Sequence, residues 1–217
     1  MDPFSLVLFL TPLLVYMVVI SFVRFSGRIY VSTGGKEIAA LALAVSGMLI
    51  VGPVELFFPM AAATVFGPLV WGILALFYML CVSLFVIGAT PKIIVYGSKA
   101  DGLLEPLLNA ARALDENAQA DKGSLQVYLP TSGVHLRIGT SSSLDHASIM
   151  AFEDNLSAKF WSLLRTELRN QLGDRKVERK RGLPVLIATV LLASFLLTHW
   201  FQTTEEITNG FVAWFWR

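Results

Sequence analysis

The chain has 217 residues, of which 55% are hydrophobic and 15% are charged, and its formal net charge is +1. Soluble domains carry about 25% charged residues, so this deficit favours a protein that is embedded in a lipid bilayer. The single cysteine, Cys81, excludes a disulfide bond within the chain and a metal site built from cysteines.

The first predicted element is a transmembrane helix from about Phe4 to Val23. This stretch carries no charge and is long enough to cross the hydrocarbon core at about 1.5 Å per residue. It follows Met1-Asp2-Pro3 rather than the basic start of a cleaved signal peptide, so we expect the helix to be retained. We also expect Pro12 to bend it.

The next two predicted spans form a membrane hairpin. The segment from Ile38 to Pro91 carries a single formal charge, Glu55. As one helix it would be about 80 Å long, far beyond the hydrocarbon core of about 30 Å. The chain must therefore fold back, and prolines and a glycine at 59–68 mark the turn. We predict spans at about 38–58 and 68–90.

The segment 92–181 is the part that is long and polar enough to fold in water. Its periodicities predict a strand at 92–96, a helix at 102–118, strands at 125–129, 134–138 and 148–152, and a helix beginning at Asn155 or Ser157. This order is typical of an α+β two-layer domain, in which helices pack on one face of a small sheet.

The clearest local signal in this domain is a β-hairpin around the turn Pro130–Gly133. Pairing Leu129 with Val134 brings all the alternating apolar residues of both strands onto one face, as burial requires. The opposite face then pairs Tyr128 with His135 and Gln126 with Arg137.

The last predicted span covers about 182–203, and the tail at 204–217 is too short to span. The tail ends in a cluster of Phe and Trp residues, which settle at the headgroup level of membranes. We expect it to lie on the outer membrane surface. A docking contact with another subunit is the alternative.

Two basic regions predict the orientation in the membrane. One is the first loop, 24–37, and the other is the cluster Arg175, Lys176, Arg179, Lys180 and Arg181. Short basic loops stay in the cytoplasm. We therefore expect both termini outside and residues 92–181 in the cytoplasm, with the protein in a bacterial inner membrane. The cluster could also attract anionic lipid headgroups.

These elements together predict an α-helical transmembrane protein with four spans and an inserted cytoplasmic α+β two-layer domain. The stretch Gly52–Pro59, Trp71, the strand at 92–96 and the hairpin at 125–138 resemble an uncharacterised family of bacterial multi-pass membrane proteins. The resemblance implies the multi-pass architecture. It implies no activity and no site.

Glu55 is the candidate functional residue within the spans. A carboxylate in a span is costly unless it is paired, protonated or hydrated, and such residues are often functional. Three interpretations are open. Glu55 lies near the outer headgroups in a structural role, handles protons or ions, or makes a hydrogen bond between packed helices.

No catalytic, cofactor or metal site is predicted, and we expect the protein not to be an enzyme. Asp145 and His146 follow the serines 141–143, but adjacent residues of a polar loop rarely converge as a triad requires. His135 and His146 lack a third zinc ligand. Gly34–Lys36 lacks the preceding strand, the glycine spacing and the hydroxyl residue of a phosphate-binding loop.

The expected function is therefore that of an interaction or regulatory module, held in the lipid bilayer, whose cytoplasmic domain docks a partner. Tyr128, His135 and Arg137 form the candidate partner face, and the partner is another protein or a second copy of the chain. Nucleic acid is not expected, because the charges of the domain nearly balance. The alternative is a small transport component in which Glu55 lines a pathway. An enzyme with its site at the membrane face of the domain ranks third.

Overall fold

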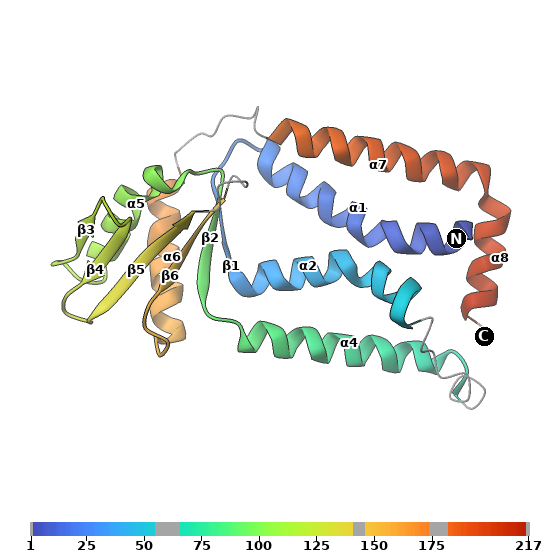
Figure 1. Cartoon of the computed structure of the whole chain (residues 1–217), viewed down its shortest axis with the longest axis horizontal. Coiled ribbons are helices and arrows are strands. Elements are labelled where there is room, and N and C mark those ends of the chain that lie inside the picture. The colour runs from blue at the N-terminus through green and yellow to red at the C-terminus, as the bar shows by residue number, and fades with distance from the viewer. Residues whose placement is uncertain (1, 55–65, 141–145, 174–181, 216–217) are drawn as a thin grey trace. The chain divides into compact units, whose positions relative to one another are not determined.

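The computed structural model describes residues 2–54, 66–140, 146–173 and 182–215 (Figure 1). The chain divides into two compact units. The first comprises 1–21, 38–88 and 184–217, and the second comprises 22–37 and 89–183. Glu55, the serines 141–143 and Asp145 lie outside the described residues. So do the basic residues Arg175, Lys176, Arg179, Lys180 and Arg181.

Helices long and apolar enough to cross a membrane dominate the first unit, and the described residues contain four of them. They are α1 (Pro3–Phe25), the stretch Gly34–Gly52 that begins with α2 (Gly34–Leu49), α4 (Leu69–Gly88) and α7 (Leu183–Gln202). A short π-helical turn, η1 (Ile50–Val54), continues α2. Their number agrees with the four spans expected from the sequence.

α1 and α2 approach closely where a proline on one helix meets a glycine on the other. Pro12 has no amide hydrogen to donate to the carbonyl of Leu8, four residues earlier in α1. A Cβ added to Gly47 of α2 would collide with this carbonyl oxygen and lie 2.6 Å from the carbonyl oxygen of Phe9. Only a glycine leaves room for such backbone contact, the usual packing of apolar helices in membranes.

Hydrogen bonds between side chains and backbone also join these helices. The hydroxyls of Ser21 in α1 and Thr189 in α7 lie 2.7 Å apart, and both residues are buried. The hydroxyl of Tyr78 in α4 donates to the carbonyl of Ala42 in α2 at 2.6 Å. In an apolar environment such polar contacts stabilise the association of helices.

The tail after α7 folds into a further helix, α8 (Thr204–Phe215), which follows α7 after a sharp bend (Figure 1). Its aromatic residues contact the same unit. Phe4 of α1 packs against Phe211 and Trp214, and Trp214 stacks on Trp71 with ring centroids 3.7 Å apart. The aromatic cluster of the tail therefore makes contacts within the chain.

We predict that Gly47→Leu destabilises the helical unit, because the larger side chain would force α1 and α2 apart. Overpacking of this kind costs about 1–3 kcal/mol. The matched control is Gly72→Leu in α4, where an added Cβ meets nothing within 4 Å. Thermal unfolding of the full-length protein in mild detergent measures the effect, and equal melting temperatures for the two variants would contradict the proposed packing.

The second unit contains a six-stranded antiparallel sheet with the order β1-β2-β6-β5-β4-β3. The strands are β1 (Tyr30–Thr33), β2 (Lys92–Tyr96), β3 (Gln119–Asp121), β4 (Gln126–Leu129), β5 (Val134–Thr140) and β6 (His146–Ala151). Two helices, α5 (Ala100–Arg112) and α6 (Ala158–Leu172), accompany them.

The predicted β4–β5 hairpin is confirmed in its register. Leu129 pairs with Val134, Val127 with Leu136, Tyr128 with His135 and Gln126 with Arg137. Leu125 lies outside β4 because its backbone is left-handed, with φ of 53°. Its carbonyl nevertheless accepts a hydrogen bond of 3.0 Å from the amide of Ile138, its predicted partner.

Two strands were not expected from the sequence. β1 occupies the first loop, and its four residues are too few for alternation to be recognised. β3 lies just beyond residues 102–118, where a single helix was predicted. That helix ends at Arg112, because the carboxylate of Asp115 accepts a hydrogen bond from the amide of Asn117 and turns the chain.

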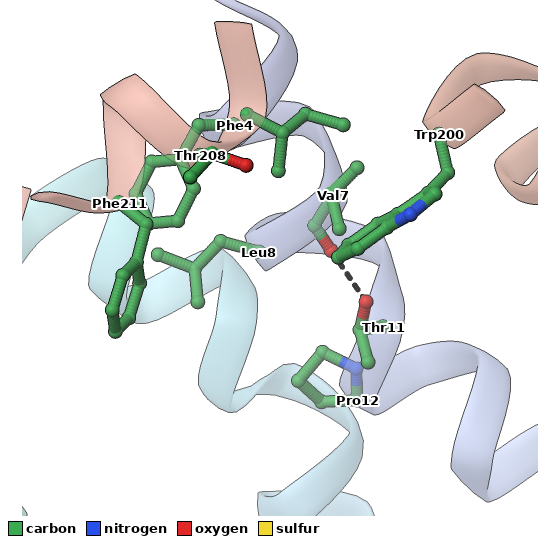
Figure 2. Close-up of a pocket in the computed structure, with 9 residues that line it drawn as sticks. Phe4, Val7, Leu8, Thr11, Pro12, Trp200, Thr208 and Phe211 are labelled. Carbon is green, nitrogen blue, oxygen red and sulfur yellow. Dashed lines mark hydrogen bonds between the residues drawn. The ribbon is translucent and has the colours of Figure 1, made fainter. Parts of the chain in front are cut away.

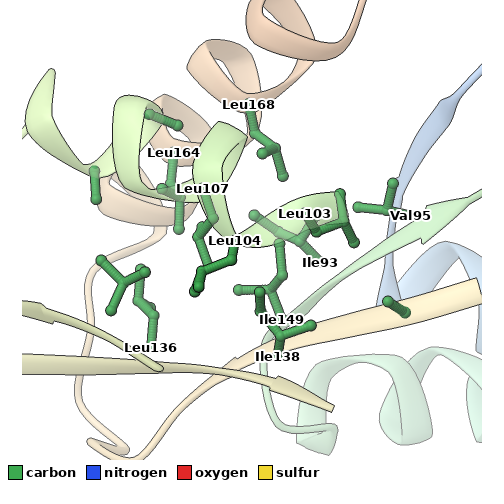
Figure 3. Packing of buried hydrophobic residues seen from close by; sticks show 14 of the residues in the cluster. Ile93, Val95, Leu103, Leu104, Leu107, Leu136, Ile138, Ile149, Leu164 and Leu168 are labelled. Atoms are coloured by element: carbon green, nitrogen blue, oxygen red, sulfur yellow. The ribbon is translucent and has the colours of Figure 1, made fainter. Parts of the chain in front are cut away.

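One face of the sheet and the two helices enclose the hydrophobic core (Figure 3). Leucines of α5 and α6 point toward the strands, and the side chains that are fully buried include Leu103, Leu107, Leu136, Ile149 and Leu164. Ser157 caps α6 as predicted, because its side chain accepts a hydrogen bond from the amide of Phe160 at 3.1 Å. Leu163 of α6 lies outside this core and is 46% exposed.

Leu136→Ala is predicted to destabilise the second unit by about 2–5 kcal/mol, because it leaves a cavity in the centre of the core. Leu136 is 0% exposed. Leu163→Ala serves as the control and should change the free energy by less than about 0.5 kcal/mol. Amide hydrogen exchange of β4–β6 in the full-length protein measures the change in free energy of unfolding for both variants. Equal exchange rates in the two variants would show that the core is assigned incorrectly.

Candidate functional site

The two faces of the sheet have different surroundings. α5 and α6 cover the face that carries Val127, Leu136 and Ile149, all of which are fully buried. On the opposite face, large apolar side chains reach solvent at the β4–β5–β6 end of the sheet. Tyr128 is 38% exposed, Met150 is 39% exposed and Phe152 is 56% exposed. We call Tyr128, His135, Arg137, Met150 and Phe152 the open patch.

The register of the strands brings the members of the open patch together. Arg137 of β5 pairs with Met150 of β6 and, on its other side, with Gln126 of β4. Phe152 extends β6, since its amide donates to the carbonyl of His135 at 3.1 Å. The patch therefore crosses three adjacent strands.

The other end of this face is covered in part. The hydroxyl of Tyr96 donates to a carboxylate oxygen of Glu37, in the first turn of α2, at 2.9 Å. Beside it, Ile94 is only 1% exposed although its neighbours Ile93 and Val95 point into the core on the other face. The exposed apolar side chains of this face therefore lie in the open patch and, on the edge strand β1, at Tyr30, which is 44% exposed.

His135 is held in place by an aromatic ring and a carboxylate. Its imidazole stacks on the ring of Tyr128, with centroids 4.4 Å apart and an interplanar angle of 24°. Its Nδ1 lies 3.0 Å from Oε1 of Glu153, and its amide donates to Oε2 at 3.0 Å. One carboxylate thus fixes both the side chain and the backbone of His135.

The hydrogen bonds from His135 keep Glu153 ionised. Partial burial raises the pKa of Glu153, but the hydrogen bonds from the imidazole and the amide of His135 outweigh this effect. The net pKa lies below the usual range of a glutamate. Glu153 is therefore a carboxylate at neutral pH and is already engaged by His135.

Arg137 is the exposed cation of the open patch. Among the described residues the only ion pair joins His135 to Glu153, so Arg137 has no carboxylate partner there. Lys92 of β2 pairs with Met150 from the other side. Met150 therefore lies between two cationic residues, and the patch combines an apolar centre with positive flanks.

The sequence identified Tyr128, His135 and Arg137, and the structure places them on adjacent strands. It missed Met150, Phe152 and Glu153. Alternation along β6 was a usable signal for Met150 and Phe152. They lie two and four residues after Ser148, so they share its face of the sheet, whereas the buried Ile149 points to the other face. Glu153 follows the strand, and no sequence pattern indicates its contact with His135.

One of the reasons for setting aside a phosphate-binding loop changes in the structure. β1 does precede Gly34 directly, so the strand that a phosphate-binding loop requires is present. The glycine spacing and the hydroxyl residue are still missing from Gly34–Lys36. His146 lies beside Tyr96, with ring centroids 5.8 Å apart, at the other end of the face from His135. In the described parts of the chain, no three metal-ligating side chains cluster.

Two cavities accompany these features. One, of about 390 Å³, lies in the helical unit between α1, α7 and α8 (Figure 2). The other, of about 540 Å³, lies on the α5 side of the sheet. It is lined by Asp101, Leu104, Glu105, Leu108, Ala120, Lys122 and Leu125. Neither cavity includes a residue of the open patch.

Comparison with family models, curated proteins and solved structures gives no match to this chain. The resemblance to an uncharacterised bacterial membrane family therefore stays a prediction from the sequence.

We predict that Glu153→Gln loosens the open patch in a pH-dependent way. A carboxylate with a lowered pKa stabilises the fold above its unfolded pKa of about 4.3, and this contribution is lost as the pH falls through the folded pKa. At pH 7 the amide of His135 should exchange about threefold faster in the variant than in the wild type. The difference should shrink as the pH falls through the folded pKa of Glu153, which lies below the usual range of a glutamate.

The control is Glu105→Gln, an exposed residue of α5, which should leave the His135 amide unchanged at every pH. An exchange difference that persists below the pKa of Glu153 would contradict the assigned role of its charge.

Proposed function

We propose that this chain is an integral membrane protein of a bacterial inner membrane and that its α+β unit docks a protein partner on the open patch. In this proposal the four apolar helices span the bilayer, both termini lie outside, and the α+β unit lies in the cytoplasm. The chain performs no catalysis of its own. It acts as a membrane-held interaction or regulatory module.

The observation that carries the proposal is the composition and exposure of the open patch. Tyr128, Met150 and Phe152 keep between a third and three fifths of their surface in solvent on the sheet face opposite α5 and α6. Aromatic residues, Met and Arg are the types enriched at protein interfaces, whereas scattered single apolar residues are normal. Their concentration on three paired strands supports binding rather than chance exposure.

The charges of the patch indicate what the partner presents. Arg137 and Lys92 flank Met150, and the nearby carboxylate of Glu153 is engaged by His135. A partner with an apolar side chain flanked by carboxylates complements this arrangement. We therefore propose an acidic, partly apolar protein surface as the ligand.

The membrane orientation rests on the distribution of charge. The first loop carries Arg24, Arg28 and Lys36, and the basic residues before α7 carry the same sign. Both regions lie on the cytoplasmic side in the proposed topology, as expected for short loops rich in Lys and Arg. The alternative function, transport through Glu55, depends on a residue outside the described part of the chain, and no described contact favours it.

Site-specific crosslinking in native membranes tests the docking. A photoreactive amino acid at Met150 should give a discrete product with another protein, whereas the same group at Leu163, exposed on α6, should not. A product between two copies of the chain would overturn the choice of a different protein as partner.

The captured protein is then purified and its affinity for two charge-reversal variants is compared. We predict that Arg137→Glu weakens binding by about tenfold or more, because an attractive charge contact becomes repulsive. Arg169→Glu on α6 is the matched control and should bind as the wild type does. Equal losses in the two variants would show that the open patch does not determine binding.

A further inference from the structure

The cavity between α1, α7 and α8 is apolar, and the hydroxyls of its two threonines already donate hydrogen bonds to backbone carbonyls (Figure 2). Its lining consists of Phe4, Val7, Leu8, Thr11, Pro12, Trp200, Ile207, Thr208 and Phe211. The two threonines satisfy their hydroxyls within their own helices. Thr11 donates to the carbonyl of Val7 at 2.7 Å, and Thr208 donates to the carbonyl of Thr204 at 2.9 Å. The cavity therefore suits a ligand segment without polar groups.

The walls of the cavity are held by close packing. Ile207 of α8 is only 4% exposed, and a Cβ added to Gly210 would lie 2.6 Å from Cβ of Phe4. Figure 2 shows Phe211 on one side of the cavity and Trp200 on the other, with residues of α1 between them. At about 390 Å³ the cavity falls in the size range of preformed ligand sites.

The helices that line the cavity expose apolar side chains along their length, and this exposure indicates the source of such a ligand. Val18, Val19 and Phe22 of α1 and Leu197 and Phe201 of α7 are about half exposed or more, on helices long and apolar enough to cross a bilayer. Lipid hydrocarbon covers surfaces of this kind in a membrane. Trp200, itself 46% exposed, is of the type that settles at the boundary between acyl chains and headgroups.

The charged side chains that the structure describes in this unit are all acidic. Within the described residues of the helical unit, the formally charged side chains are Asp2, Glu205 and Glu206. Asp2 precedes α1, and the two glutamates lie in the first turn of α8, directly before the lining residue Ile207. Carboxylates attract a headgroup that carries an amine and repel an anionic one.

We infer that this cavity binds one acyl chain of a phospholipid with a zwitterionic amine headgroup, and that the carboxylates beside it select this headgroup. The chain lies among Leu8, Thr208 and Phe211, and the ammonium group of the lipid faces Glu205 and Glu206. This inference rests on the membrane placement in the proposed function. It is independent of partner docking.

Photolabelling in nanodiscs tests the inference with the full-length protein. The bilayer contains phosphatidylethanolamine and phosphatidylglycerol, and the phosphatidylethanolamine carries a diazirine in one acyl chain. Labelling of the cavity residues should exceed that of Leu80 and Leu84, exposed on α4, by about tenfold, a preference of about 1.4 kcal/mol that packing against the cavity walls and the headgroup contact would supply. Equal labelling at both places would show ordinary surface lipid only and would overturn the site.

Two variants make the comparison specific. Thr208→Phe fills the cavity and should remove the excess labelling, whereas Thr198→Phe, at an exposed position of α7, should not. When phosphatidylglycerol carries the diazirine instead, the excess of cavity labelling over surface labelling should be smaller. In the double variant Glu205→Gln/Glu206→Gln, the two lipids should give the same excess. Undiminished labelling from phosphatidylglycerol in the wild type would overturn the headgroup selection.

The outcomes also separate this inference from the proposed function. Arg137→Glu should leave the labelling unchanged, so a failure of partner docking does not alter the result. Labelling that is missing from all four apolar helices would overturn the membrane placement and the lipid site together.

Discussion

The register between β4 and β5 is the constraint on which the second unit depends. Side chains alternate across a strand, so a shift of β4 by one residue against β5 would move Val127 into solvent and Tyr128 into the core. The core and the open patch are therefore two consequences of one pairing. Asp115 supports it at the turn, where its carboxylate accepts hydrogen bonds from the amide and the hydroxyl of Thr131. These bonds lower the pKa of Asp115, although burial alone would raise it.

The helical unit depends on a different principle, because lipid gives helices no hydrophobic reason to associate with one another. Close backbone contacts and hydrogen bonds between buried polar groups stabilise the association of the helices instead. Gly47 admits the backbone of α1, and the hydroxyls of Ser21 and Thr189 meet between α1 and α7. The packing of α8 on Phe4 adds aromatic contacts at one end.

Sequence reasoning succeeded where the physical signal was local. Long uncharged stretches indicated the four apolar helices, and strict alternation indicated the β4–β5 hairpin with its register. It failed for β1, whose partner β2 lies about sixty residues later, and for the end of α5, which a side-chain hydrogen bond of Asp115 determines. Strands of three or four residues carry too little pattern to be recognised alone.

The candidate sites also differ in whether local sequence patterns could predict them. Tyr128, His135 and Arg137 could be grouped because they share a face of one hairpin. The contact of Glu153 with His135 and the cavity beside Phe4 and Phe211 join residues far apart in sequence, so only the folded chain reveals them. Local periodicity predicts which face of an element a side chain occupies. It does not predict which residues from other parts of the chain contact that face.

The strand order has a consequence for how the protein is made. β3, β4, β5 and β6 are neighbours in sequence as well as in the sheet, so they can pair as soon as they are synthesised. β1 is synthesised before α2 and α4 but finds its partner β2 only after both helices have been completed. If those helices fail to insert, β2 is left with an open edge, and open edges pair with other chains. In the proposed membrane placement, correct insertion of α2 and α4 would therefore protect the sheet from aggregation.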